Sequence, residues 1–178
     1  MRGENKMNKK SFFVITLMLT VLILSACGKK IQEPRLSLEY NDEQLKVIHY
    51  GDRYNKTQED IEKRLKDYMV GKKFEELPVI PFDEEIIIEN TNFDVDEYEI
   101  YDFILDKRGN IISDFNTAGS VVGKYEDNKA YFKFIDTVES RKYEDYAIDN
   151  KNIHCLLIKC KIGKSEFAFA TLILDSKE

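Results

Sequence analysis

The chain is poor in the residues that build most metal and nucleophilic sites. Of its 178 residues, only two are histidine and three are cysteine. Neither His49 nor His154 lies in a His-x-His or His-Glu-x-x-His pattern, and no two cysteines form a Cys-x-x-Cys pair. The only comparable serine stretch, 119–123, has the wrong spacing for a Gly-x-Ser-x-Gly nucleophile turn, and no glycine-rich phosphate loop is present. These absences disfavour transition-metal binding, serine hydrolysis and phosphate-loop chemistry.

Long hydrophobic runs are also scarce. The one clear example, residues 12–24, is too short to span a bilayer as a helix. A basic start precedes it and Leu24-Ser25-Ala26-Cys27 follows it, an arrangement typical of a secretory signal. These four residues resemble the lipobox of bacterial lipoproteins, in which the cysteine thiol receives a diacylglyceryl group and the chain is cleaved just before it. The alternative is an ordinary signal peptide that has a cysteine there by chance.

The lipobox resemblance implies that residues 1–26 are a signal peptide and that Cys27 is the lipid-attachment residue. The protein is then held on the extracytoplasmic face of the cell membrane through this lipid. Cleavage leaves 152 residues, the size of one domain. We expect a polar tether at 27–34 and one folded domain at 35–178.

The mature chain also lacks an excess of positive charge. Residues 1–26 contain four of the 27 basic and one of the 33 acidic residues, so 23 basic and 32 acidic residues remain, a net side-chain charge of −9. Nucleic acid and anionic lipid headgroups are therefore disfavoured as partners. No segment is rich in proline, serine and glycine, so the chain is expected to fold.

Alternating apolar residues predict a chain built mainly of strands. A β-hairpin is predicted from 35–40 and 45–49, and one short amphipathic helix over 58–70, closed by Gly71. Further strands are predicted at 84–90, 97–106, 129–138, 153–162 and 166–174. Their inward residues include Ile86, Ile88, Ala130, Phe132, Phe134 and Val138. This pattern favours a mainly β fold, an antiparallel β-sandwich with one short amphipathic helix.

Segments 34–40, 49–54 and 97–110, with the closing hairpin, look like those of uncharacterised lipoproteins of low-GC bacteria that carry an immunoglobulin-like sandwich. The resemblance covers most of residues 34–174. It implies an immunoglobulin-like antiparallel β-sandwich and offers no catalytic residues.

Two cysteines remain in the mature domain beside the lipid-bearing one. Cys155 and Cys160 are five residues apart on one predicted strand, a separation of about 16 Å. A disulfide needs Cα atoms about 4.4–6.8 Å apart, so we expect two free thiols, with Cys160 in the core. Adjacent strand residues point to opposite faces, so Cys155 and His154 cannot form a catalytic dyad. Both histidines are expected to be hydrogen-bonded residues near strand ends.

The acidic run Asp94-Val95-Asp96-Glu97, with Glu99, is the only candidate calcium site. It lacks the glycine and the final glutamate that an EF-hand loop requires, so the favoured interpretation is a solvated loop. We expect no metal, no cofactor and no catalytic residue.

The favoured function is a non-catalytic binding or accessory module that meets a protein or peptide partner through sheet edges or an aromatic patch. The candidate surface aromatics are Tyr98, Tyr101, Tyr143 and Tyr146. Two alternatives remain open: a small hydrolase of cell-wall or peptide substrates that uses acidic residues, and an immunity or inhibitor lipoprotein that captures a secreted toxin.

Overall fold

The computed structural model describes residues 34–52, 57–69, 74–92, 95, 97–113, 125–126 and 129–176. The chain separates into two units, Met1–Gln32 and Glu33–Glu178, and every described residue belongs to the second. Cys27 and nearly all of the predicted tether lie outside the described residues, as do Asp94 and Asp96 of the acidic run.

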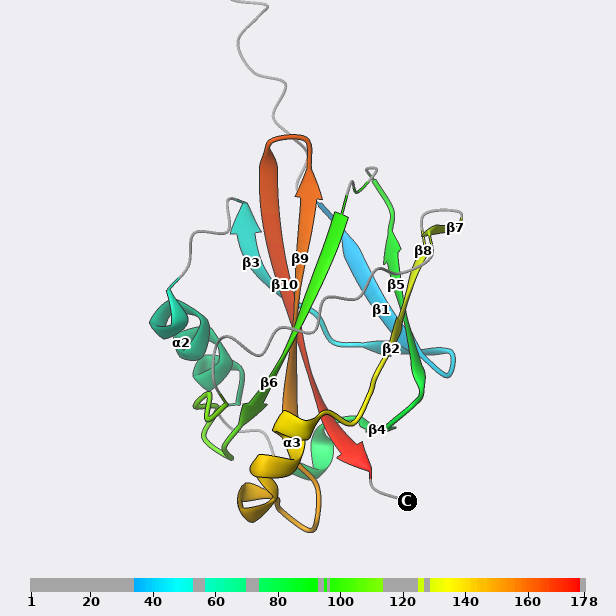
Figure 1. Ribbon diagram of the computed structural model, residues 1–178. Helices are drawn as coiled ribbons and strands as arrows, with labels where there is room; N and C mark the ends of the chain where they lie inside the picture. Colours follow the sequence, from blue (N-terminus) through cyan, green and yellow to red (C-terminus); the bar gives the residue numbers. More distant parts are fainter. Residues whose placement is uncertain are drawn as a thin grey trace, which may run out of the picture. The chain divides into compact units, whose positions relative to one another are not determined.

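Two sheets form most of this unit (Figure 1). The first, sheet A, has the strand order β2 (Glu43–Leu45), β1 (Leu36–Tyr40), β5 (Glu85–Asn90), β8 (Lys129–Lys133) and β7 (Tyr125–Glu126). The second, sheet B, has the order β3 (Ile48–Asp52), β10 (Ser165–Ser176), β9 (Ile153–Ile162) and β6 (Glu97–Leu105). The short strand β4 (Val79–Pro81) pairs in parallel with β10, whereas the other pairs are antiparallel. The predicted mainly β fold of two sheets is confirmed.

The inner faces of the two sheets meet in an apolar core, as strand alternation predicts. Sheet A contributes Ile86, Ile88, Ala130, Phe132 and Phe134 among others, all buried. Sheet B contributes Ile100, Leu156, Ile158, Cys160 and Phe169 among others. The prediction that Ile86 and Ile88 point inward therefore gave the correct inner face of β5.

Helix α2 (Gln58–Met69) matches the predicted helix closely. Thr57 and Asp60 cap its start reciprocally: the Asp60 amide donates to the Thr57 hydroxyl at 3.3 Å, and the Thr57 amide donates to the Asp60 carboxylate at 3.3 Å. The helix packs Ile61, Leu65 and Met69 against the outer face of sheet B in a second core. Sheet B is thus buried on both faces, and α2 forms a third layer (Figure 1).

Two local predictions are wrong. The segment after the first turn is not one strand, because the chain leaves sheet A after Leu45 and enters sheet B at Ile48. Val138 does not point inward: it is 74% exposed, since β8 ends at Lys133. Val138 instead begins a second helix, α3 (Val138–Lys142), which the sequence analysis did not predict.

A capping box explains why the chain turns into α3. The Ser140 amide donates to the Thr137 hydroxyl at 3.1 Å, and the Thr137 amide donates to the Ser140 hydroxyl at 3.0 Å. These bonds satisfy two amides that a helix start leaves without intrahelical partners.

Candidate functional site

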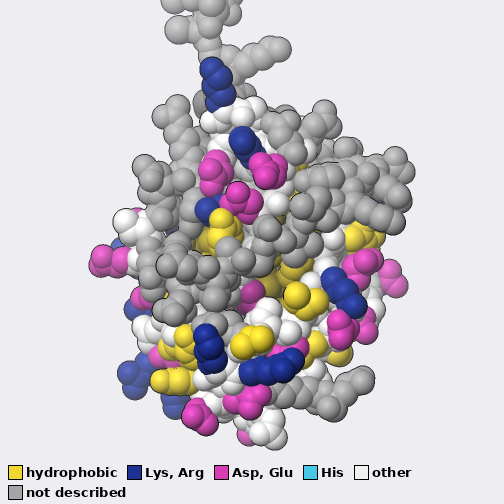
Figure 2. Space-filling model, viewed as in Figure 1, with side chains coloured by type: hydrophobic (Ala, Val, Ile, Leu, Met, Phe, Trp, Pro, Cys, Tyr) yellow, Lys and Arg dark blue, Asp and Glu magenta, His cyan; other side chains and the backbone are white. Residues whose placement is uncertain are grey.

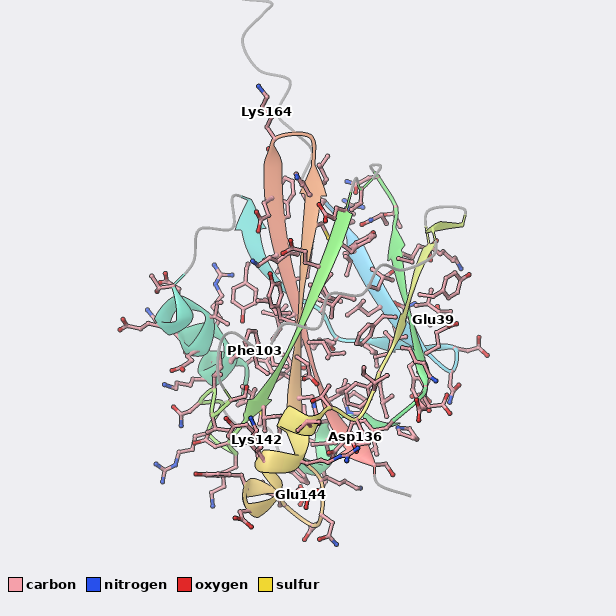
Figure 3. The ribbon with its side chains drawn as sticks, viewed as in Figure 1. Glu39, Phe103, Asp136, Lys142, Glu144 and Lys164 are labelled. Carbon is pink, nitrogen blue, oxygen red and sulfur yellow. The ribbon has the colours of Figure 1, made fainter. Side chains whose placement is uncertain are left out.

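The strand register defines two ends of the sandwich. Leu36 pairs with Asn90, next to the point where the described domain begins at Pro34. Glu85 pairs with Lys133 at the other end of the same sheet, from which the chain continues into α3. We call these the Pro34 end and the α3 end. Figure 3 shows Lys142 and Glu144 at the α3 end and Lys164, on the β9–β10 turn, at the opposite end.

A buried cluster of three titratable side chains lies in sheet B near the α3 end. Asp102 on β6, His154 on β9 and Asp175 on β10 all point into the layer between the sheets. The Nδ1 atom of His154 lies 2.9 Å from each carboxylate oxygen of Asp102, and its Nε2 atom lies 3.4 Å from Asp175 Oδ2. His154 and Asp175 are fully buried, whereas the Asp102 side chain keeps 19% exposure.

The geometry favours a positive charge on His154. An ionised carboxylate only accepts hydrogen bonds, so two flanking carboxylates require a proton on both ring nitrogens. Burial by itself would lower the pKa of His154, but the charge and hydrogen bond of Asp102, followed by those of Asp175, outweigh it and raise the pKa to about 9. His154 is therefore an imidazolium at neutral pH, between two carboxylates.

Asp175 is held by further bonds. It accepts the Asn152 backbone N–H at 2.6 Å and the Asn152 side-chain amide at 3.2 Å. Burial opposes its ionisation, but the hydrogen bonds from His154 and Asn152 and the charge of His154 lower the pKa of Asp175. The ionised form of this carboxylate is thus favoured and paired, although its side chain has no exposed surface.

This cluster is unsuited to catalysis. A general base needs a free nitrogen lone pair, and both nitrogens of His154 face acceptors. A metal needs ligands that converge on one point, whereas the two carboxylates lie against different ring nitrogens. Across the described part of the chain, no group of three His, Cys, Asp or Glu side chains could hold a metal ion.

Both described cysteines are free, as predicted, and both are buried. They lie on opposite sides of β9: Cys155 packs in the core under α2 and Cys160 in the core between the sheets. Burial raises the pKa of each thiol far above its usual range, with a smaller contribution from Asp102 at Cys155. Neither sulfur is available as a thiolate nucleophile.

Exposed hydrophobic side chains concentrate at the α3 end. The large ones in the described residues are Val79 at 40%, Ile135 at 48%, Val138 at 74% and Tyr146 at 58% exposure. Val79 pairs with Leu174 near the end of β10, and the other three lie in residues 135–151, which we call the α3 segment. Figure 2 shows hydrophobic side chains at the surface in the half of the molecule where Figure 1 places α3, with charged side chains between them.

A groove of about 400 Å³ opens beside Val79, between the edge strand β2 of sheet A and β4 of sheet B. Its lining residues are Tyr40, Asn41, Glu43, Leu45, Pro78, Val79 and Pro81. The groove lies at the α3 end, and both apolar and polar side chains line it.

Of the four tyrosines predicted to be surface aromatics, one is buried, one is half-buried and two lie in the α3 segment. Tyr98 is buried at 5% exposure, so this prediction is wrong: its hydroxyl accepts a hydrogen bond from the Asn90 side-chain amide. Tyr101 is half-buried, donates to Glu99 at 2.7 Å and lies beneath the Lys159 ammonium. Tyr143 and Tyr146 lie in the α3 segment with ring centroids 6.2 Å apart.

Little of the predicted acidic site is described. Glu97 forms an ion pair with Lys161 at 3.8 Å, and Glu99 approaches Lys159 at 3.9 Å. Both glutamates face cross-strand lysines, which is ordinary sheet-surface pairing. Calcium binding at Asp94 and Asp96 stays untested because they lie outside the described residues.

His154 is hydrogen-bonded near the start of its strand, as predicted, but its two carboxylate partners were not predicted. One signal was available: Asp102 interrupts the apolar stretch 100–105, and Asp175 directly follows the apolar stretch 167–174 within the same strand. A charged residue inside a strand that is buried on both faces needs a partner of opposite charge.

Comparison with protein families, curated proteins and solved structures finds no match to the chain. Within the described ranges, no helix has the length and apolar character needed to cross a membrane.

Proposed function

We propose that the protein is a lipid-anchored extracytoplasmic lipoprotein whose α3 end binds a protein partner without catalysing a reaction. One observation carries this proposal: the four large hydrophobic side chains exposed in the described residues all lie at the end opposite Pro34. The proposed lipid on Cys27 is attached through the tether that leads to Pro34. Within the domain, the apolar surface therefore lies at the opposite end from Pro34, where the tether joins.

Charge favours a protein partner over the membrane surface. The mature chain has a net charge of −9, and acidic side chains, among them Asp136, Glu144 and Asp145, are interspersed with the apolar residues of the α3 segment. Anionic headgroups would repel such a surface. A protein with apolar side chains and a basic rim would complement it.

The α3 segment is also held in one conformation. Arg141 forms an ion pair with Asp136 at 2.9 Å, the Thr137–Ser140 capping box holds the helix start, and Ile148 and Lys151 exchange backbone hydrogen bonds. A segment ordered before binding loses less conformational entropy when a partner docks.

The imidazole and thiol groups of the described core, which a hydrolase could use, are occupied elsewhere, and Glu97 and Glu99 of the acidic run face Lys161 and Lys159. The two nitrogens of His154 are held by carboxylates, and the two thiols are buried and protonated. This arrangement favours binding over the alternative of a small hydrolase. Toxin capture by an immunity lipoprotein would be one form of such binding.

We also propose that the two-sheet part belongs to the immunoglobulin-like class, with α2 as an added layer on sheet B. The support is the pair of facing sheets with a shared apolar core and largely antiparallel pairing.

The test places a photo-crosslinking amino acid at Val138 in the full-length protein in intact cells, with Lys164 on the opposite turn as the control. We expect a discrete protein adduct from position 138 and none from position 164. The partner identified from this adduct, once purified, should bind the Val138→Glu variant at least tenfold more weakly than wild type. Adducts only with lipid would point to the membrane surface instead. Equal adducts from both positions, or none from position 138, would refute the proposal.

A further inference from the structure

The α3 segment is connected to the buried cluster at both of its ends. Phe134, which directly precedes the segment, packs its ring edge-on against the His154 ring with centroids 5.0 Å apart. Asn152, which directly follows the segment, donates its backbone N–H to Asp175 at 2.6 Å. Residues 135–151 therefore leave and re-enter the fold at two contacts with the same group of side chains.

The contacts of the cluster with Phe134 and Asn152 depend on the balance between the positive charge of His154 and the negative charges of Asp102 and Asp175. Protonated His154 lies between the carboxylates of Asp102 and Asp175, and Asp175 is fully buried. Loss of the ring proton would leave two carboxylates beside a neutral ring that can donate only one hydrogen bond. One carboxylate would then be a buried charge that faces a ring nitrogen without a proton to donate. Such a charge favours local opening of the structure and entry of water.

In the described part of the chain, no other charged side chain forms an ion pair with His154. Sheet A and the residues after β4 present only the rings of Phe134 and Phe82 to His154, at 5.0 and 6.0 Å between centroids. The charged groups that face His154 are Asp102 from β6 and Asp175 from β10, and Asn152 adds neutral donors at the start of β9. The charge on His154 therefore controls the state of the cluster.

We propose that the Asp102–His154–Asp175 cluster is a pH-sensitive switch that orders the α3 segment while His154 is protonated and releases it when the proton is lost. The proposal deepens the proposed function, since it makes this cluster the regulator of the proposed docking surface. The transition falls on the alkaline side of neutrality, because the two carboxylates raise the pKa of His154 to about 9. A domain outside the cytoplasm meets the pH of its surroundings directly, so such a change would reach it.

The experiment measures amide hydrogen exchange of the full-length protein in detergent micelles from pH 6 to pH 10, corrected for intrinsic exchange. We expect protection of residues 134–152 to fall at least tenfold between pH 7 and pH 10. Residues 162–165, at the turn on the opposite end, serve as the internal reference and should show no change beyond the correction.

Three variants separate the switch from general destabilisation. His154→Gln should show weak protection of residues 134–152 at every pH. Asp175→Asn should shift the transition to lower pH by one unit or more, because the imidazolium loses one counter-charge. His49→Gln is the matched control: His49 is the only other histidine, it stacks on Phe169 at 4.9 Å between centroids, and its removal should leave the transition unchanged.

A spectroscopic measurement keeps the proposal testable if His154→Gln fails to fold. In wild type at pH 7, both ring ¹⁵N signals of His154 should have the shifts of a protonated imidazolium, assigned by comparison with His49→Gln. A neutral ring at pH 7, unchanged protection of residues 134–152 up to pH 10, or loss of the transition in His49→Gln would overturn the switch. None of these measurements needs a binding partner. The results can therefore refute the switch while binding at the α3 end is supported, or support the switch while binding is refuted.

Discussion

Gly109 lies directly against the backbone of Leu65, so the turn after β6 and helix α2 meet without an intervening side chain. A Cβ atom placed on Gly109 would lie 3.2 Å from the Leu65 carbonyl carbon and 3.2 Å from the Lys66 nitrogen. Gly109 also has φ +83°, a conformation that residues with a side chain rarely adopt. The turn needs glycine for its backbone and for the close approach of the helix.

This contact gives a prediction with a built-in control. Gly109→Ala should destabilise the domain through both backbone strain and the clash with α2. Gly163→Ala is the control because Gly163 has φ +58° and no atom within 4 Å of a new Cβ. We expect Gly163→Ala to cost about 1 kcal/mol and Gly109→Ala at least about 1 kcal/mol more, measured by urea unfolding. Equal costs would mean that the helix does not lie against this turn.

The buried cluster predicts how stability depends on pH. The pKa of His154 is about 9 in the folded protein and about 6.5 when the chain is unfolded, so its contribution is complete below pH 6.5 and is lost as pH rises through 9. This difference corresponds to about 3 kcal/mol. Because the pKa of Asp175 is lowered, its contribution is instead lost as pH falls below its ordinary value of 3.8. We expect maximal stability between about pH 4 and pH 6.5.

The measurement is urea unfolding of the full-length protein in micelles across pH 4 to 10. His49→Gln should reproduce the alkaline loss of wild type, whereas His154→Gln should flatten it. An alkaline slope that survives in His154→Gln would assign the effect to another group.

The corrected position of Val138 can be tested against Phe132. Phe132 is buried between the sheets, so Phe132→Ala should cost about 3–5 kcal/mol through lost burial and the cavity left behind. Val138→Ala should change the free energy of unfolding by no more than about 0.5 kcal/mol, because Val138 is exposed on α3. A large cost at Val138 would restore the original prediction that it points inward.

The lipid anchor is testable at a single residue. Cys27→Ala removes the thiol that would carry the diacylglyceryl group, so the protein should leave the membrane fraction or remain unprocessed. Cys160→Ala is a control, since its thiol is buried in the core. A Cys27→Ala protein that kept its lipid label and its electrophoretic mobility would exclude the lipobox.

The other two cysteines, Cys155 and Cys160, should give two free thiols. After denaturation without reductant, the mature protein should show free thiols at Cys155 and Cys160 by mass spectrometry. In the native state both should react with a thiol reagent many times more slowly than after denaturation, since burial raises their pKa. A linked 155–160 peptide would contradict the strand geometry of β9.

Strand periodicity predicted much of the fold. β5, β6, β9 and β10 lie within a few residues of their predicted bounds, and the helix pattern of Ile61 and Leu65 located α2. The periodicity of apolar residues is clear in these elements, because one or both of their faces are buried along most of their length. The crossing from sheet A to sheet B at Lys46 and Val47 was missed, since apolar alternation does not reveal which sheet a strand joins.

The α3 end was harder to predict. Val138 continues the alternation of Phe132 and Phe134, and only the Thr137–Ser140 cap shows that the strand pattern has stopped. The Asp102–His154–Asp175 cluster joins residues up to 73 positions apart in the chain, a proximity that depends on strand order and register. The burial of Tyr98 was not predicted, because its partner Asn90 comes from the other sheet and the sequence does not show that the two residues meet.

Strand β10 has a consequence for the timing of folding. It pairs with β3, β4 and β9, so sheet B cannot assemble before residues 165–176 have left the ribosome. Strand pairings between distant segments form slowly, because the entropy of closing a long loop is lost before the new contacts stabilise the structure. An exported lipoprotein, which we propose this chain to be, must stay unfolded until it has been threaded through the membrane. The central place of a late strand would provide that delay and leave the final assembly to the far side.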